Sequence, residues 1–294
     1  MELAPIIEAT TRKVEARLNE LLPAADSAPT TIHAAMRYSI FAGGKRIRPL
    51  LCLEAAKACG GSESAALDAA CALETLHTYT LIHDDLPCMD DDDLRRGKPT
   101  NHKVYGEGIA VLAGDALLTE TFAILARVPQ NDLYGVRDYV AEMAYQTGSR
   151  RLIGGQVLDL EGEGRHLTLE EVRAIHLGKT AALIMAAVRL GGMSAGCSAE
   201  QLNALTEYGR NLGLAFQIID DILDVTSTPE VLGKSIGKDA REEKATYCTR
   251  VGMDNARAEA QKLTAAARAA LDIFPAEKRE TLLAINDYLL NRHY

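Results

Sequence analysis

Apolar residues recur at three- and four-residue spacing along most of the chain, for example at Leu202, Leu205, Tyr208 and Leu212. This spacing places them on one face of a helix, and runs of β-branched residues are short. Most prolines fall between the periodic stretches, where they begin or end helices. The pattern predicts an all-α protein of roughly ten helices, near residues 4–22, 30–42, 49–58, 63–86, 109–127, 132–160, 169–190, 199–226, 240–271 and 276–291, with looser segments at 87–108 and 227–239.

The length and apolar content of the chain are sufficient for a large buried core. It has 294 residues, of which 47% are hydrophobic. Neither a low-complexity linker nor an internal repeat divides it, so we expect one domain over residues 1–294. A helical bundle is the typical arrangement of such a chain.

Charge and cysteine content argue against several classes of function. The formal net charge of −9 and the pI near 5.4 disfavour binding to nucleic acid or to an anionic membrane, because both surfaces are negative. The six cysteines form no C-x-x-C pair and indicate reduced, packed thiols, as in a cytoplasmic protein. No signal peptide is evident, and we expect no membrane span because no apolar run approaches about 18 residues.

Two clusters of acidic residues lie inside otherwise apolar helical stretches. Leu, Ile and Phe flank both clusters, so buried carboxylates there would be costly unless a cation or a hydrogen-bond donor compensated them. An acidic run is more often a solvated helix face, but the apolar neighbours and the recurrence of the pattern favour a metal site. The residues concerned are Asp84, Asp85, Asp90, Asp220, Asp221 and Asp224.

The break in the first cluster has a geometric reason. Pro87 should end the helix that carries Asp84 and Asp85, because on an unbroken helix Asp84 and Asp90 would lie about 240° apart and could not share an ion. Oxygen ligands without nearby Cys or His in ligand spacing select a hard cation such as Mg²⁺, which usually bridges carboxylates to phosphates. The clusters therefore predict a diphosphate between them.

Basic residues complete this picture. The turn at residues 43–49 combines glycines with three cations and is suited to an oxyanion, although an ordinary surface connection is an equally good interpretation of the turn alone. Arg95 and Arg96 either hold phosphate oxygens or pair with the neighbouring acidic run at residues 90–93. The same two interpretations apply to the lysines that follow the second cluster, which are Lys234, Lys238 and Lys244.

Gly178-Lys179-Thr180 ends like a nucleotide-binding P-loop, but Arg173 stands where that motif requires its first glycine. We reject the nucleotide interpretation. A glycine within a helical pattern instead predicts a local irregularity, with backbone carbonyls near Lys179 and Thr180 facing a cavity. Such dipoles would stabilise positive charge.

A second candidate metal motif is Glu74-x-x-His77, which is half of a di-iron signature. Its only possible mate, Glu163-x-x-His166, lies between glycines, where a regular helix is not expected. A lone His on such a helix is more often a packed core residue than a ligand. However, His77 precedes Asp84 by seven residues and shares its helix face, which favours a functional role.

Taken together, these segments resemble the trans-isoprenyl diphosphate synthases, most closely the bacterial farnesyl diphosphate synthases or geranyltranstransferases. The resemblance covers nearly the whole chain. It is carried by residues 43–49, 84–90, 95–97, 154–159, 179–180, 217–224 and 232–239. It implies an isoprenoid-synthase helical bundle around a central cavity.

The resemblance also implies a role for each residue of the site. Two or three Mg²⁺ ions, which Mn²⁺ may replace, would be held by Asp84, Asp90 and Asp220 with Asp85, Asp221 and Asp224 in support. The remaining assignments are an allylic diphosphate on Arg95, Lys179, Lys234 and Lys244, isopentenyl diphosphate on Gly44, Lys45, Arg48, His77 and Arg96, and the reacting carbons beside Thr180 and Gln217. Whether Asp90 or Asp91 coordinates the metal is left open.

The implied reaction is the condensation of isopentenyl diphosphate with dimethylallyl and then geranyl diphosphate, which yields farnesyl diphosphate by ionisation, condensation and proton loss. A homodimer is also implied. The alternatives are a geranylgeranyl diphosphate synthase of the same fold, a terpene cyclase, a non-catalytic partner subunit and a metal buffer. The second diphosphate site argues against a cyclase, the intact acidic motifs argue against a partner subunit, and a metal buffer would leave the basic residues unexplained.

Product length is assigned to Tyr79 and Thr80, which precede Asp84 by five and four residues. Thr80 projects within about 40° of Asp84, whereas Tyr79 is about 140° away. In the resembling family an aromatic residue at the Tyr79 position commonly forms the floor of the product pocket. Tyr79 is therefore expected to limit the product to fifteen carbons.

Overall fold

The computed structural model describes residues 2–226 and 246–290. The described chain is helical almost throughout, which confirms the all-α prediction. One short antiparallel hairpin, β1 (Leu94–Arg95) with β2 (Lys98–Pro99), pairs Arg95 with Lys98.

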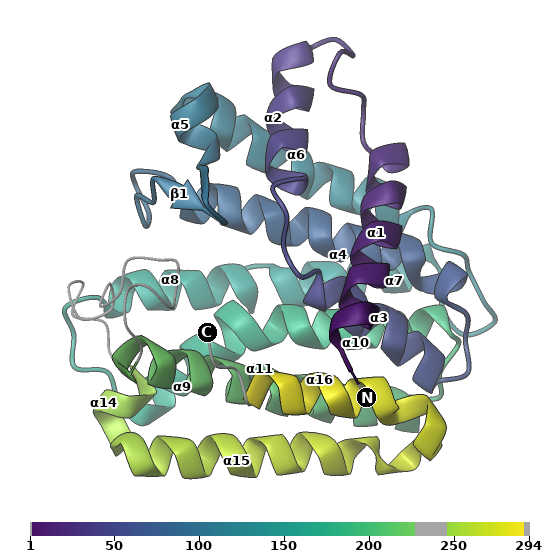
Figure 1. The fold of residues 1–294 in the computed structure, drawn as a ribbon, viewed down its shortest axis with the longest axis vertical. Coiled ribbons are helices and arrows are strands. Elements are labelled where there is room, and N and C mark those ends of the chain that lie inside the picture. Colours follow the sequence, from purple (N-terminus) through teal and green to yellow (C-terminus); the bar gives the residue numbers. More distant parts are fainter. Residues whose placement is uncertain (1, 227–245, 291–294) are drawn as a thin grey trace.

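The helices of the described chain pack into one bundle (Figure 1). Up to residue 162 they are α1 (Ala4–Leu21), α2 (Thr30–Ile40), α3 (Ile47–Ala58), α4 (Glu63–Asp84), α5 (Asn101–Tyr105), α6 (Glu107–Leu125), α7 (Val136–Thr147) and α8 (Leu152–Gly162). Beyond it are α9 (Leu169–Ile175), η1 (His176–Ala181), α10 (Ala182–Ser194), α11 (Ala199–Thr226), α14 (Tyr247–Val251), α15 (Met253–Ala270), η2 (Leu271–Ile273) and α16 (Ala276–Leu290).

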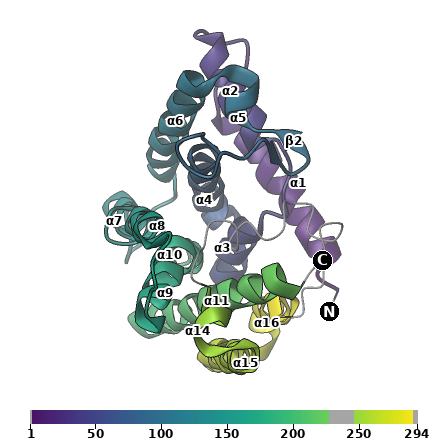
Figure 2. The same ribbon diagram turned by 90° about the vertical axis from the view of Figure 1, so that its left-hand side faces the viewer.

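Helices α3, α4 and α10 form the centre of the bundle, because each packs against the others and α10 is apolar and buried on nearly every side. Figure 2 shows α4 between α6 and α3, with α7, α8 and α10 on one flank and α11, α15 and α16 below. The β-hairpin, α9 and α14 gather at one end of the molecule, on the left in Figure 1. That end holds the residues with candidate chemistry.

Two of the predicted helices are interrupted. The stretch 132–160 is divided into α7 and α8, because Gly148 takes an extended conformation with ψ near −169° and ends α7. The stretch 240–271 is divided at Gly252, whose φ of 80° separates α14 from α15. Residues 240–245 lie outside the described residues.

The irregularity expected at Gly178 is confirmed as a π-helical segment, η1, between α9 and α10. A glycine is required on both sides of its contact with α8. A Cβ at Gly155 would lie 2.2 Å from the backbone nitrogen of Lys179, and one at Gly178 would lie 2.8 Å from the carbonyl of Arg151. This close approach fixes Lys179 against α8.

One reason for expecting no membrane span, the lack of a sufficiently long apolar stretch, does not hold among the described residues. By length and composition alone, two helical stretches would suffice: Glu107–Leu125 with 39% of the apolar window buried, and Leu169–Ser194 with 78% buried. The second is a core helix, which has the same composition as a membrane span because it is enclosed by apolar neighbours. Neither is more than weak evidence for a membrane protein.

A largely buried ion pair connects α7 with α10. The Nε and Nη2 groups of Arg189 donate to the two carboxylate oxygens of Glu142 at 2.7 and 2.8 Å, and Nη1 donates to Thr206 on α11 at 2.6 Å. The two charged side chains are 19% and 10% exposed. The guanidinium thus fastens three helices.

We predict that Arg189→Met lowers the free energy of unfolding by about 3 kcal/mol, because Glu142 is left buried without its cation. The double variant Arg189→Met/Glu142→Leu should regain more than half of that loss, since it leaves no unpaired charge. Urea denaturation measures both. A double variant as unstable as Arg189→Met would show that packing, not charge pairing, causes the loss.

Candidate active site

The first acidic motif lies where α4 ends. The helix stops at Asp84, and the amide of Asp90 donates to the Asp84 carbonyl at 2.9 Å, so the chain folds back on itself. This confirms the break expected before Pro87. Asp84 and Asp90 are both half-buried at the turn.

Asp85 and Arg95 form an ion pair that changes the expected roles of both. The Nε of Arg95 donates to the Asp85 carboxylate at 2.7 Å, and its Nη2 lies 3.4 Å from Asp92. Asp85 is 3% exposed, and burial raises the pKa of its carboxyl group while Arg95 opposes that shift. The pairing of Arg95 with nearby acids is thus the interpretation that the structure supports in this conformation.

The surroundings of Asp84 destabilise its ionised carboxylate, and a bound cation would stabilise it. Burial, together with the neighbouring Asp90, raises the pKa of Asp84 to about 6, although Lys179 and Arg95 pull it down. A carboxyl group in this setting favours either a proton or a metal ion. The oxygen-only donor set, the turn geometry and this destabilised carboxylate fit Mg²⁺.

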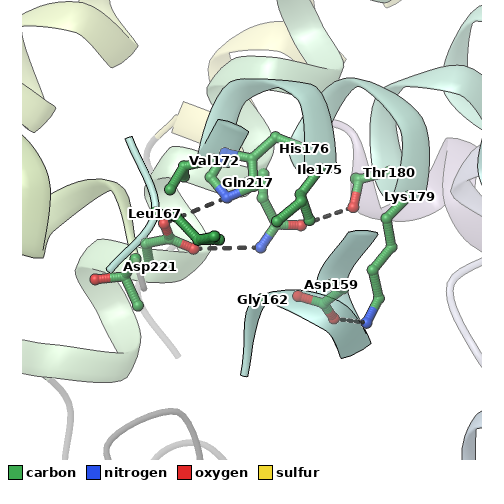
Figure 3. Close-up of a pocket in the computed structure, with 11 residues that line it drawn as sticks. Asp159, Gly162, Leu167, Val172, Ile175, His176, Lys179, Thr180, Gln217 and Asp221 are labelled. Carbon is green, nitrogen blue, oxygen red and sulfur yellow. Dashed lines mark hydrogen bonds and ion pairs between the residues drawn. The ribbon is translucent and has the colours of Figure 1, made fainter. Parts of the chain in front are cut away.

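Lys179 faces the first motif from η1. Its Nζ lies 2.6 Å from the Asp159 carboxylate on α8 (Figure 3), and it also interacts electrostatically with Asp84 and Asp90. Burial would lower the pKa of Lys179, but Asp159 raises it above the usual value. Lys179 is therefore a fixed cation beside the predicted diphosphate position. From the sequence, Asp159 belonged to a motif of the resembling family, but no role could be assigned to it.

Thr180 and Gln217 are brought together as expected. The Thr180 hydroxyl donates to Gln217 Oε1 at 2.7 Å, and the Gln217 amide donates to Asp221 at 3.3 Å (Figure 3). These two hydrogen bonds connect η1 with α11. The three hydrogen-bonded residues line a cavity of about 120 Å³. The other wall of this cavity is apolar and includes Leu167, Val172 and Ile175.

The carboxylate of Asp221 is used in contacts within the protein. It is 4% exposed and accepts the backbone N–H of Tyr247 at 2.7 Å, while His176 Nε2 lies 3.5 Å away. Burial lowers the pKa of His176 to about 4, so the ring is neutral. His176 was not anticipated from the sequence. The available signal was its position three residues before Lys179, close to Gly178, where an irregular helix was expected.

The six predicted metal ligands do not form a ready-made cluster. Among the described residues, no three acidic, His or Cys side chains converge closely enough to hold an ion. The pairing of Asp85 with Arg95 and of Asp221 with Tyr247 accounts for part of this. Metal binding by the first and second motifs therefore stays a prediction, and so does the choice between Asp90 and Asp91.

The second motif faces the same space as the basic turn. Asp220 and Asp224 are half-buried on α11, and Asp220 interacts electrostatically with Arg48. Arg48 Nη1 lies 3.2 Å from His77 Nε2. Burial and the neighbouring Arg48 hold the pKa of His77 well below its usual range, so this imidazole is neutral and accepts from Arg48.

The remaining residues of the turn point in different directions. Lys45 Nζ lies 2.8 Å from the hydroxyl of Tyr288 on α16. The Arg96 guanidinium donates to the Gly43 carbonyl and covers Gly44, where a Cβ would lie 2.6 Å from Arg96 Cζ. Gly44 therefore provides the space that Arg96 occupies. Lys234, Lys238 and Lys244 lie outside the described residues.

Comparisons with known proteins agree with this geometry. The model of the family described as Polyprenyl synthetase matches residues 29–277, and the chain belongs to this family of prenyltransferases. It is 47% identical over 284 residues to a geranylgeranyl diphosphate synthase of Cyanophora paradoxa, covering 95% of this chain and 93% of that protein. It is 49% identical over 270 residues to the heterodimeric geranylgeranyl pyrophosphate synthase large subunit 1 of Arabidopsis thaliana chloroplasts, covering 90% and 73%.

Solved structures show the same fold. An FPP/GFPP synthase of Zymomonas mobilis superposes with a TM-score of 0.88 at 33% identity and covers 98% of both chains. The geranylgeranyl pyrophosphate synthetase of Pyrococcus horikoshii has a TM-score of 0.90 at 31% identity and covers 99% of both chains. The predicted isoprenoid-synthase bundle is confirmed.

The two adjacent carboxylates of the second motif should differ in function. We predict that Asp220→Asn lowers kcat by about 100-fold or more, because it removes negative charge that would hold the ion at the leaving group. Asp221→Asn should cost less than about tenfold, since the amide oxygen still accepts the Tyr247 N–H. Single-turnover rates at saturating Mg²⁺ separate these effects. Equal losses would mean that Asp221 is also a metal ligand.

Proposed function

We propose that the protein is a geranylgeranyl diphosphate synthase, which condenses isopentenyl diphosphate with dimethylallyl, geranyl and farnesyl diphosphates. The support for the product is the identity of 47–49% to proteins of that name. The observation that carries the reaction is that Lys179, which Asp159 holds at 2.6 Å, interacts electrostatically with both Asp84 and Asp90 of the first acidic motif. This product replaces the farnesyl diphosphate expected from the resemblance.

The residues assigned to this reaction have complementary roles. Asp84, Asp90 and Asp220 would hold Mg²⁺, and the bound ion would supply the positive charge that a departing diphosphate requires. Lys179 adds a fixed cation on the α8 side. The Thr180 hydroxyl donates to Gln217, so its lone pairs can face the carbocation left on the allylic chain.

The acceptor substrate and the final proton are handled without a protein base. The double bond of isopentenyl diphosphate attacks the carbocation, and the departed diphosphate is the base that removes the proton. The apolar wall formed by Leu167, Val172 and Ile175 keeps water away from the cation. The catalytic residues in this scheme are those already assigned: Asp84, Asp90, Lys179, Thr180, Gln217 and Asp220.

A farnesyl product is the second candidate, and it would follow if the bulky side chain of Tyr79 closed the end of the product pocket. Tyr79 is 7% exposed and meets His83 edge to face, with ring centroids 5.4 Å apart. His83 Nε2 lies 3.0 Å from the Val111 carbonyl and packs over Gly114 of α6. We infer that this stack holds Tyr79 against α6 as a side wall, which leaves the small Thr80 nearest the growing chain.

Product sizing distinguishes the two candidates. With radiolabelled isopentenyl diphosphate and each allylic primer, the wild-type protein should release chiefly C20 product, and Thr80→Phe should shorten it because one ring occupies about the volume of an isoprene unit. Tyr79→Ala should alter product length less than Thr80→Phe does. Chiefly C15 product from the wild type, lengthened by Tyr79→Ala, would favour the farnesyl alternative.

The basic turn should serve one substrate only. We predict that Arg48→Lys raises the KM for isopentenyl diphosphate by about tenfold and leaves the KM for geranyl diphosphate nearly unchanged, because lysine cannot contact both His77 and a phosphate with a forked group. Steady-state kinetics with each substrate varied in turn tests this. Equal increases in both KM values would show that the turn is not a separate site.

We also propose that the protein is a cytoplasmic homodimer. The support for pairing is the exposure of Val111 and Leu112 on α6, at 40% and 54%. The location rests on six free cysteines, as expected in a reducing compartment. Light scattering of the wild type and of Leu112→Arg tests the pairing, and a dimeric Leu112→Arg variant would place the interface elsewhere.

A further inference from the structure

In the sequence, Arg46 lies between Lys45 and Arg48, two residues of the turn assigned to isopentenyl diphosphate. Its side chain nevertheless faces away from theirs. Lys45 is exposed and Arg48 is half-buried, whereas the Arg46 side chain is 0% exposed. Its backbone is left-handed, with a φ of 48°, a conformation that non-glycine residues seldom adopt. Such a conformation persists where surrounding contacts enforce it.

Those contacts come from three helices. Arg46 Nη1 lies 2.5 Å from Glu74 on α4, and Nη2 lies 2.8 Å from Glu15 on α1 and 2.5 Å from the Ile40 carbonyl at the end of α2. Burial would lower the pKa of Arg46, but Glu74 and Glu15 hold it above its usual value. The guanidinium therefore stays charged beneath the turn.

Glu74 has a second electrostatic role in the same place. It is 2% exposed and stabilises the cationic forms of Arg48 and Arg96 as well as that of Arg46. It also precedes His77 by three residues, so both lie on one face of α4. Glu74 thus contributes negative charge to a cluster of side chains that is otherwise mainly basic.

We propose that Arg46 and Glu74 are positioning residues for isopentenyl diphosphate: their buried ion pair holds the turn in its left-handed path and thereby aims Arg48 and Lys45 at the substrate. This inference rests on the proposed function. It accounts for the Glu74-x-x-His77 spacing without a di-iron site, because Glu74 secures the turn and His77 orients Arg48.

A purely structural role would lower stability without changing one substrate selectively. Arg46→Met and Glu74→Met should each raise the KM for isopentenyl diphosphate by about tenfold, while kcat and the KM for geranyl diphosphate change by less than about threefold. The double variant should resemble Arg46→Met alone, because the two residues act as one unit. Steady-state kinetics and urea denaturation are measured on the same preparations.

Two further variants provide matched comparisons. Arg189→Met removes another arginine that is largely buried and pairs with a glutamate, and it should lower stability while leaving both KM values unchanged. Arg46→Gly permits the left-handed backbone without the ion pair, and it should impair isopentenyl diphosphate binding as Arg46→Met does. If Arg46→Gly binds like the wild type, backbone conformation alone is sufficient and the proposal is wrong.

The remaining outcomes are also decisive. Unchanged KM values, or equal increases for both substrates, would overturn the proposal. If the Arg46 and Glu74 variants do not fold, Glu15→Gln weakens a single contact of the same guanidinium and must still raise the KM for isopentenyl diphosphate selectively. A wild-type protein that does not consume isopentenyl diphosphate would refute the proposed function instead.

Discussion

The main constraint on this fold is that charged side chains of both signs are buried inside a helical bundle and must compensate one another. Asp85 with Arg95, Lys179 with Asp159, and Arg46 with Glu74 are all pairs of this kind. The partners are 10, 20 and 28 positions apart and come from different elements, so the cost of desolvation is offset only when those elements are packed together. The cavity and the fold are thus held by the same contacts.

The π-helical segment contributes a different kind of constraint. Its extra residue per turn allows Gly178 to meet Gly155 at backbone distance, and it directs Lys179 toward α8 while Thr180 turns toward α11. Adjacent residues on a regular helix point about 100° apart in a fixed sense, so the irregular segment adds freedom in their placement. Such segments are frequent at functional sites.

The sequence was a good guide to elements and a poorer guide to pairings. Helical periodicity predicted α4 and α11, and Pro87 predicted the break after the first motif, because both effects are local. The breaks at Gly148 and Gly252 were missed, since glycine is compatible with a helix until tertiary contacts decide its conformation. The commitment of Asp221 to Tyr247 and the partnership of Arg46 with Glu74 join residues far apart, which no spacing rule can reveal.

The contact between Lys45 and Tyr288 has a practical consequence. These residues are 243 positions apart, and yet one hydrogen bond connects the basic turn to the helix near the end of the sequence. A peptide fused behind α16, such as a purification tag, would alter the surroundings of the lysine that we assign to isopentenyl diphosphate. Protein intended for kinetic measurements should therefore carry its tag in front of α1, on the opposite terminus.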